Sequence, residues 1–313
     1  MMFAGAMFAA LLLDAAIGWP DAIYDRVGHP VTWVGKLIDA CDRRFNLETR
    51  PEFQRRLMGC AVAFGIAAAA YLAAALLIWL LPGHHMALYA TAVLAWPLIA
   101  ARSLHDHVKA VALPLSQGDL PAARAAVAMI VGRDPDRLDA AGVARAALES
   151  LAENASDGIV APLFWGVLLG LPGIAAYKAI NTLDSMIGHL SPRHAAFGWA
   201  AARIDDVVNL IPARLTALLF AAVSGQFRPA WDCMWRDASL HRSPNAGWPE
   251  AAMAGALHIR LSGPRVYDGA LSGEAWVNGG APDPVADDLA LGLVLYLKAM
   301  LALALILAAL AVI

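Results

Sequence analysis

The stretch LMGCAVAFGIAAAAYLAAALLIWLLPGHHMALYATAVLAWPLIAA, residues 57–101, contains no Asp, Glu, Lys or Arg. A transmembrane helix needs about 20 apolar residues, so this stretch is long enough for two spans. The sequence Pro82-Gly83 followed by two histidines separates the two halves. We therefore expect spans near residues 58–81 and 87–104, and further spans near 2–19 and 289–313, where the chain is also apolar.

The composition supports a membrane protein. The 313 residues are 60% hydrophobic and 16% charged, whereas soluble domains average about 45–50% apolar and 25% charged residues. We predict an all-α, polytopic integral membrane protein that forms a single membrane-embedded domain over residues 1–313. The lipid bilayer is its expected surroundings. A net charge of −3 indicates no basic surface, so no nucleic-acid partner is expected.

Two weaker apolar stretches, 158–177 and 207–224, contain prolines, glycines or a charge. Interrupted helices of this kind occur where the backbone lines a cavity enclosed by protein. We expect both to be membrane-embedded broken helices. Residues 105–157 read as polar helices, with Asp119 and either Asp136 or Asp139 as N-caps. Residues 225–288 form a polar region rich in Trp, Pro and Gly.

The distribution of basic residues predicts the orientation, because short cytoplasmic loops are enriched in Lys and Arg. Segment 82–86 has none, whereas segment 20–57 has seven: Arg26, Lys36, Arg43, Arg44, Arg50, Arg55 and Arg56. We therefore place 20–57 and 105–157 on the cytoplasmic side of the cell (inner) membrane. We further expect that 178–206 does not reach the outside, so that all polar motifs meet at the cytoplasmic face.

The first polar motif is ESLAENASDG, residues 149–158. Its candidate residues are Glu149, Glu153 and Asp157 for a metal, and Asn154 and Ser156 for substrate or phosphate. Carboxylate oxygens are ligands that Mg²⁺ prefers, often together with substrate phosphates. The alternative for Glu149 is an ion pair with Arg145, one turn earlier, on a solvated helix face.

Two further motifs, YKAINTLDSMIGH (177–189) and AARIDDVVNLIPAR (201–214), place ionisable groups beside apolar stretches. Such groups are costly in a membrane and indicate function. The candidates are Asp184, His189, Asp205 and Asp206 for catalysis, and Lys178, Asn181, Arg203, Asn209 and Arg214 for substrate or phosphate binding. His189 is a candidate base, with a structural hydrogen bond as the alternative. Arg214 requires an anionic partner from the protein or from a substrate.

From these residues alone, two functions remain open: a membrane enzyme that handles phosphate-bearing substrates with Mg²⁺, and a secondary transporter. A transporter of this size is expected to show repeats of similar hydropathy. The chain instead concentrates its polar residues between 142 and 214 and between 225 and 288, which favours the enzyme.

The chain contains several long motifs through which it resembles the CobD/CbiB family of adenosylcobinamide-phosphate synthases. It extends through nearly the whole chain, with Ser262 where a second glycine is expected. The motifs are LLLDAAIGWP, VGHPVTWVGKLI, GDLPAAR, IVGRD, ESLAENASDGIVAPLFW, YKAINTLDSMIGH, FGWAAARIDDVVNLIPARLTAL, RDASLHRSPNAGWPEAAMAGAL and RLSGPRVYDG.

The resemblance implies a ligase of cobalamin biosynthesis that uses ATP, with Mg²⁺ expected. Its corrinoid substrate is adenosylcobyric acid, whose free propionate would be joined to aminopropanol or to aminopropanol O-phosphate. Trp231, Trp235, Trp248 and Trp276 are candidate walls for the corrinoid, or anchors at the lipid interface. The alternatives are a Mg-dependent prenyltransferase-like enzyme and a transporter or corrinoid-binding scaffold. A homo-oligomer, or association with other cobalamin-assembly enzymes, stays open.

Overall fold

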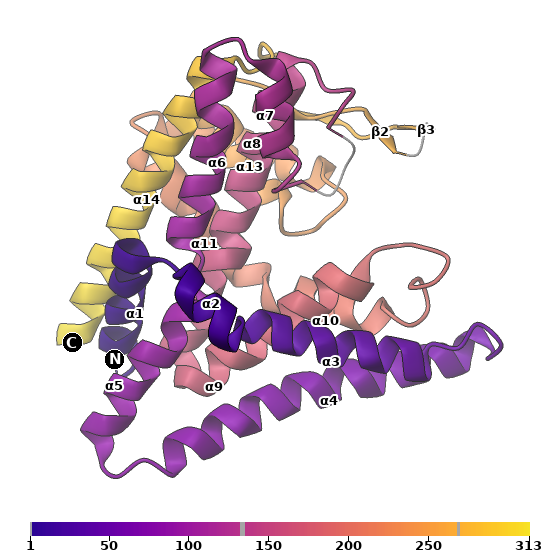
Figure 1. Cartoon of the computed structure of the whole chain (residues 1–313). Coiled ribbons are helices and arrows are strands. Elements are labelled where there is room, and N and C mark those ends of the chain that lie inside the picture. Colours follow the sequence, from indigo (N-terminus) through magenta and orange to yellow (C-terminus); the bar gives the residue numbers. More distant parts are fainter. Residues whose placement is uncertain (1, 132–134, 268–269) are drawn as a thin grey trace. The chain divides into compact units, whose positions relative to one another are not determined.

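A computed structural model describes residues 2–131, 135–267 and 270–313 (Figure 1). The ends of the IVGRD and RLSGPRVYDG motifs, residues 132–134 and 268–269, lie outside the described residues. The described chain is mostly helical, with very little strand and four long apolar helical segments, which confirms the predicted all-α polytopic membrane fold.

Four helical segments are long and apolar enough to cross a membrane: Glu52–Trp79, His84–Ser116, Ala140–Gly188 and Ala286–Val312. The first is α4 and the last is α14. The second contains α5 (His84–Ala95), η1 (Trp96–Leu98) and α6 (Ala101–Ser116). The third contains α8 (Ala140–Ala155), η2 (Ser156–Val160), α9 (Ala161–Leu183) and η3 (Asp184–Gly188). These segments include the stretches predicted near 58–81, 87–104 and 289–313, and also the interrupted stretch 158–177.

The first predicted span differs from expectation. Its helix, α1 (Ala4–Ile17), has 14 residues, which at about 1.5 Å per residue is shorter than a bilayer core of about 30 Å. It ends because Gly18 has φ 65°, and the indole of Trp96 donates to the Gly18 carbonyl at 2.9 Å. The stretch is long enough to cross a membrane only when α1 is combined with the following helices of Ala22–Phe45, and the two parts are bent by 109° relative to each other.

A second bent pair covers the stretch predicted near 207–224. It consists of α10 (Trp199–Val208) and α11 (Leu210–Val223), which meet at 47°. In α9, Gly170 has non-helical dihedral angles and Pro172 follows it, so this helix is also interrupted. Broken helices at both weaker stretches agree with the predicted class of fold.

The described chain divides into two compact units that interleave along the sequence. The first comprises Met1–Ala100, Ala161–Asn209 and Leu307–Ile313, and the second comprises Ala101–Val160 and Leu210–Ile306. The single domain over residues 1–313 stays a prediction.

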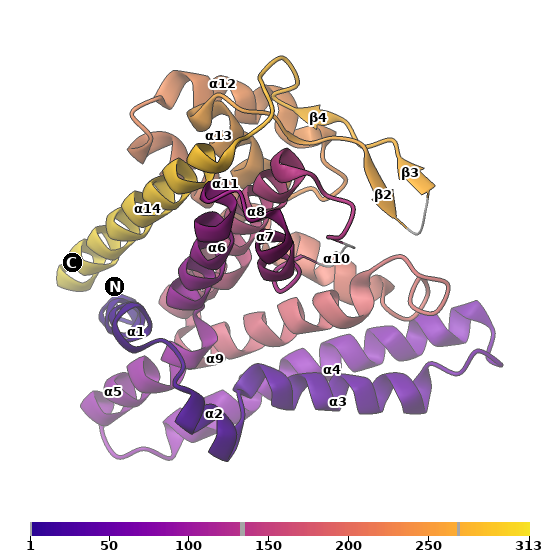
Figure 2. The same cartoon turned by 45° about the horizontal axis from the view of Figure 1, so that its top comes forward.

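The first unit is built on α3 (Pro30–Phe45) and α4, which lie side by side (Figures 1 and 2), with the short α2 (Asp21–Val27) preceding them. Its core joins apolar residues of α3, α4 and α9 to η3 and to the segment before α10: Ile38, Val62, Leu183, Ile187 and Phe197 among others. Gly59 permits close packing there, because a Cβ at this position would lie 1.9 Å from the Phe197 carbonyl oxygen.

The second unit contains α6, α7 (Leu120–Val127), α8, α11, α12 (Phe227–Asp237), η4 (Ala238–Leu240), α13 (Gly247–Leu257) and most of α14. The predicted N-caps are confirmed: Asp119 accepts from Ala122 N at 3.1 Å, and Asp139 accepts from Gly142 N at 2.7 Å. These bonds satisfy backbone donors that a helix start leaves without partners.

Two short antiparallel ladders also belong to the second unit. Strand β1 (Leu261–Ser262) pairs with β4 (Trp276–Val277), and β2 (Arg265–Tyr267) pairs with β3 (Ala270–Ser272), as Figure 2 shows for the latter. Strands of two or three residues are too short to produce an alternating sequence pattern, so they could not be predicted from the sequence.

Candidate functional site

Two of the predicted polar motifs contain a turn of π-helix. One is η2 in the ENASDG sequence, and the other is η3, which begins at Asp184. A π-helical turn inserts one residue into an α-helix and is frequent at functional sites. The turn η2 belongs to the second unit and η3 belongs to the first.

In the first unit, three predicted catalytic carboxylates lie together. Asp184 on η3 is close enough to Asp205 and Asp206 on α10 for their charges to interact. Asn181, one turn before Asp184, is another neighbour of Asp205. The structure therefore brings together residues that are more than 20 positions apart in the sequence.

Asp205 is the most buried of these carboxylates, with an exposed fraction of 8%. Its Oδ2 accepts from Asn209 Nδ2 at 2.9 Å, and Asn209 Oδ1 in turn accepts from Tyr177 OH at 2.9 Å. Among the described residues, Asp205 Oδ1 makes no hydrogen bond of ordinary geometry, and the Asn181 side chain is close enough to Asp205 for a weak one. A buried carboxylate oxygen without a partner is costly, and a bound cation or a donor on a substrate would offset that cost.

Asp184 is held against the backbone of its own π-helical turn. A Cβ added to Gly188 would lie 1.9 Å from Asp184 Oδ1. Only glycine therefore leaves space for this position of the carboxylate. Beside the cluster, Arg203 Nη1 lies 3.0 Å from Asp206 Oδ2, in an ion pair that is largely exposed.

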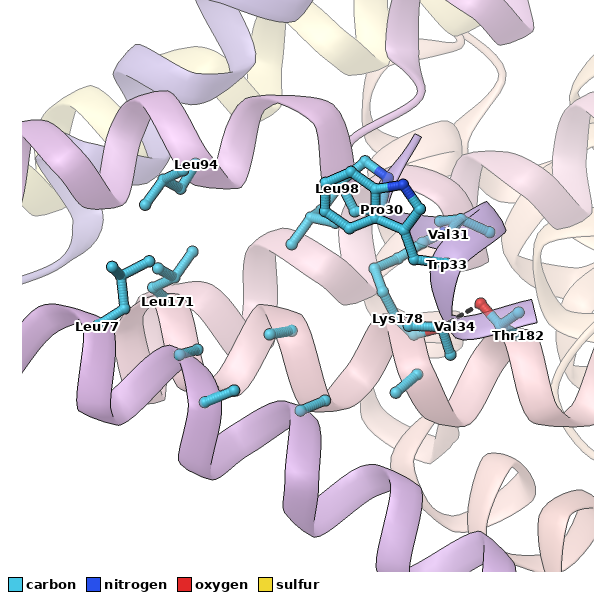
Figure 3. Close-up of a pocket in the computed structure, with 15 residues that line it drawn as sticks. Pro30, Val31, Trp33, Val34, Leu77, Leu94, Leu98, Leu171, Lys178 and Thr182 are labelled. Atoms are coloured by element: carbon cyan, nitrogen blue, oxygen red, sulfur yellow. Dashed lines mark hydrogen bonds between the residues drawn. The ribbon is translucent and has the colours of Figure 1, made fainter. Parts of the chain in front are cut away.

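Lys178 faces different surroundings. It lines a pocket of about 300 Å³ between α3, α4, α5–η1 and α9, whose other walls are mostly apolar (Figure 3). Its Nζ lies 3.3 Å from Asn181 Oδ1, and its carbonyl accepts from Thr182 Oγ1 at 2.6 Å. The predicted phosphate contact of Lys178 stays a prediction.

His189, the predicted base, contacts a group of residues that the sequence analysis missed. Its Nε2 lies 3.1 Å from Nδ1 of His194, and His194 Nε2 lies 3.5 Å from Asp42 Oδ1 on α3. Arg193 binds Asp42 Oδ2 through Nε at 3.0 Å and Nη2 at 2.6 Å. Asp42 and His194 are separated by about 150 positions, so no local spacing could have indicated the contact.

The electrostatics of this group follow from its contacts. The hydrogen bond to Asp42 raises the pKa of the Arg193 guanidinium above its ordinary value. Burial lowers the pKa of His194, which favours the neutral ring, although the Asp42 charge acts in the opposite direction. A neutral imidazole carries one N–H donor and one acceptor nitrogen, so His194 can link a carboxylate to a second histidine.

In the second unit, the predicted metal ligand Glu149 is buried. Its Oε1 accepts from Ser262 N at 2.7 Å, and its exposed fraction is 5%. Arg145 instead forms an ion pair with Asp283, so the alternative of a solvated Arg145–Glu149 pair does not hold. Arg145 also lies over the ring of Trp276, with 4.6 Å between the guanidinium carbon and the ring centroid.

The other predicted residues of the first motif differ in exposure. Glu153 and Asn154 are exposed, and Asn154 Nδ2 donates to the Ser150 carbonyl at 2.9 Å. Asp157 is half-buried. Ser156 is buried, and its Oγ has no hydrogen-bond partner in the part of the chain that the structure describes. Whether this motif meets the Asp184–Asp205–Asp206 cluster stays a prediction.

Arg214 lies in the second unit, on α11. Its Nη1 donates to the Leu210 carbonyl at 2.7 Å, and its guanidinium carbon lies 4.4 Å from the ring centroid of Trp248. The anionic partner that the sequence analysis expects would therefore have to come from a substrate or from a contact other than these.

Aromatic side chains form a continuous row at the same place. Phe227 stacks on Trp231 with centroids 5.6 Å apart, Trp231 lies 5.8 Å from Trp235, and Trp235 lies 4.9 Å from Trp248. The first three recur every four residues along one face of α12. They offer ring faces to a flat ligand or to the lipid interface.

Within the described residues, no three His, Cys, Asp or Glu side chains are arranged to hold a metal ion by themselves. Mg²⁺ differs from zinc in this respect, because it is usually bound through one or two carboxylates together with water and substrate phosphates. The cluster of Asp184, Asp205 and Asp206 offers only oxygen ligands, one of them without a hydrogen bond of ordinary geometry among the described residues. This ligand chemistry fits Mg²⁺.

Comparisons with known proteins agree on one family. A sequence model described as CobD/Cbib protein matches residues 7–296. A relative from Rhodobacter capsulatus named "Cobalamin biosynthesis protein CobD" is 59% identical over 313 residues, covering 100% of this chain and 98% of the relative. Relatives of the same name from Brucella suis and a Sinorhizobium species are 52% and 46% identical, covering 82% and 92% of this chain and 81% and 91% of those proteins. No solved structure matches the chain significantly.

Proposed function

The chain belongs to the CobD/CbiB family of cobalamin-biosynthesis proteins, and from this premise we propose that it forms an amide bond. The proposed reaction joins the free propionate of adenosylcobyric acid to the amine of aminopropanol or of its O-phosphate. The product is adenosylcobinamide or adenosylcobinamide phosphate. The enzyme would be an ATP-dependent acid–amine ligase.

The chemistry requires an activated carboxylate, because a carboxylate ion is a poor acyl donor. We propose that the propionate oxygen attacks the γ-phosphorus of ATP, which releases ADP and forms an acyl phosphate. The deprotonated amine then attacks the acyl carbon, and inorganic phosphate leaves. The amine proton must be taken up by a base, for which His189 or one of the cluster carboxylates is available.

The observation that carries this proposal is the cluster of Asp184, Asp205 and Asp206, in which Asp205 is buried and its Oδ1 makes no hydrogen bond of ordinary geometry. Mg²⁺ bound there would neutralise the charge of the phosphates during transfer. Asp184 and Asp205 would hold the metal, and the Asn209–Tyr177 chain would orient Asp205. The carboxylates of the first motif, Glu149, Glu153 and Asp157, remain candidate ligands.

The cationic and amide side chains would bind the phosphates and the substrate. The proposed set is Lys178, Asn181, Arg203, Asn209 and Arg214, together with Asn154 and Ser156. Arginine suits phosphate because its planar fork of donors matches phosphate oxygens, whereas lysine acts as a compact charge. We further propose that the reaction takes place at the cytoplasmic face of the inner membrane, where the basic segments are expected to lie and where ATP would be available.

The test is a direct assay with purified protein in detergent or nanodiscs. Adenosylcobyric acid, aminopropanol O-phosphate and Mg-ATP are supplied, and the amide product and ADP are measured by mass spectrometry. The proposal predicts equal amounts of both products, and a parallel reaction with unphosphorylated aminopropanol identifies the preferred amine. Product without ADP would refute the activation step, and no product with either amine would refute the reaction.

A further inference from the structure

We infer that Asp42, acting through His194, positions His189 and fixes its ring tautomer, so that Nδ1 of His189 is the nitrogen that accepts the proton of the attacking amine. This inference rests on the proposed function for the identity of the reaction. It assigns a positioning role to Asp42 and His194, and it identifies Nδ1 of His189 as the nitrogen that takes the proton.

Asp42 is the hydrogen-bond acceptor at one end of a chain of contacts that runs through His194 to His189. The carboxylate is buried and receives hydrogen bonds from Asn46 at 2.7 Å and from Arg193 at 3.0 and 2.6 Å. An ionised carboxylate can only accept hydrogen bonds. His194 Nε2, 3.5 Å from Asp42 Oδ1, therefore faces an acceptor and carries its proton on that side.

The tautomer of His194 then determines that of His189. Burial favours the neutral form of His194, and with the proton on Nε2 its Nδ1 is an acceptor. His189 Nε2 lies 3.1 Å from this acceptor, so it must be the protonated nitrogen of its ring. The remaining nitrogen, His189 Nδ1, keeps a lone pair that can take a proton.

Other charged and polar groups around His194 are compatible with this direction. The Ser191 hydroxyl, 3.3 Å from His194 Nδ1, can donate to the same acceptor nitrogen. Arg193 is engaged by Asp42, and its backbone carbonyl accepts from Asn46 and Arg55. Glu48 lies 3.8 Å from Arg193 but is largely exposed. None of these groups offers His194 a second carboxylate.

The contacts Asp42–His194–His189 form a relay, and this relay also links α3 to the candidate site. His189 directly follows η3 and interacts with the charge of Asp184. The T-shaped contact of the two histidine rings, with centroids 4.7 Å apart, restricts the orientation of His189. A base whose ring is held in one orientation and one tautomer needs no rearrangement before it accepts a proton.

The test uses His194→Phe in the full-length protein. Phe fills the space of the imidazole ring but has no nitrogen, so the acceptor toward His189 is lost, while Asp42 keeps its hydrogen bonds from Asn46 and Arg193. The expected result is a kcat about 10- to 100-fold lower at nearly unchanged KM, which is less than the roughly 10²–10⁴-fold that general base catalysis contributes, because His189 itself is retained. Asp42→Asn should have the same effect, and Glu48→Gln, which leaves the relay intact, should behave as wild type.

A second measurement does not depend on activity. Protein labelled with ¹⁵N-histidine is examined by long-range ¹H–¹⁵N correlation, with the His189 signal assigned by its loss in His189→Gln. The inference predicts a protonated Nε2 on His189 in the wild type and a mixture of tautomers in His194→Phe. A protonated Nδ1 in the wild type would overturn the relay, as would wild-type kcat in His194→Phe. Absence of product from the wild type would instead refute the proposed reaction and leave the tautomer measurement decisive for the relay.

Discussion

Asp205 shows how a single residue can be unfavourable for stability and useful for function. Its side chain is buried, one carboxylate oxygen makes no hydrogen bond of ordinary geometry among the described residues, and two neighbouring carboxylates repel its charge. Folded proteins avoid such arrangements unless the charge is used. The sequence predicted Asp205 as a functional residue because it precedes an apolar stretch. The absence of an ordinary hydrogen bond at Oδ1 became visible only in three dimensions.

The variant Asp205→Asn should separate stability from activity. Removing the charge relieves repulsion within the cluster, so the melting temperature in detergent should be unchanged or higher, whereas kcat should fall at least about 100-fold. Asp25→Asn, which changes an exposed carboxylate on α2, is the matched control and should alter neither. A loss of folding together with activity would indicate a structural role for Asp205.

Gly188 provides a second test at the residue scale. In Gly188→Ala the new methyl group would occupy the space of Asp184 Oδ1, so the carboxylate must move. We expect at least a tenfold loss of kcat, since small displacements of catalytic groups are costly. Gly65→Ala is the control, because a Cβ there meets no atom within 4 Å. Equal activity of the two variants would contradict the position assigned to Asp184.

The ion pairs of Asp283 predict a dependence of stability on pH. Hydrogen bonds from Arg260, at 2.9 and 2.6 Å, hold the pKa of Asp283 below its ordinary value. Because the pKa in the folded state lies below that in the unfolded state, the stabilisation is present above about pH 4 and is lost as the pH falls through the folded pKa. Asp283→Asn should therefore lower the melting temperature at pH 7 and flatten its decrease toward acidic pH.

At the scale of elements, the long apolar helices could be predicted from the sequence, because hydrophobicity over about 20 residues is a strong signal. The end of α1 could not, since it depends on the positive φ of Gly18 and on the distant Trp96. The two π-helical turns were also not predictable. They change the number of residues per turn only locally, and the sequence pattern on either side remains that of an α-helix.

The aromatic row on α12 allows a test of the corrinoid contact. If it holds the macrocycle, the double variant Trp231→Ala/Trp235→Ala should raise the KM for adenosylcobyric acid at least tenfold with little change in kcat. Trp79→Ala, which removes a tryptophan that is 78% exposed on α4, should leave the KM unchanged. If the row anchors the chain in lipid instead, the KM will stay the same and quenching of tryptophan fluorescence by brominated lipids will decrease.

At the scale of the whole molecule, the sequence motifs identified most of the candidate residues, but they did not predict which of these residues lie close together in the folded chain. Asp184, from the second motif, lies close to Asp205 and Asp206, from the third motif, and no spacing in the sequence predicted this contact. Glu149 lies in the other unit and is engaged by Ser262. Asp42 and His194 carry no motif signal of their own, because their contact joins α3 to a segment far along the chain.

The predicted topology can be tested by cysteine labelling. A cysteine in place of Arg193 should not react with an impermeant thiol reagent added to intact cells, because segment 178–206 is expected to stay off the outer face. The background requires only Cys41→Ser and Cys60→Ser. Cys233 is buried, and burial raises the pKa of its thiol to about 12, so it should remain unreactive. Rapid labelling from outside would contradict the topology.

The most direct test of the central claim is the stoichiometry of the purified enzyme in a single reaction. Wild-type protein, adenosylcobyric acid, aminopropanol O-phosphate and Mg-ATP are combined, and amide and ADP are counted together, with Asp205→Asn as the inactive control. The account predicts one ADP for each amide with the wild type and neither product with the variant. Amide formation without ADP, or full activity of Asp205→Asn, would contradict it.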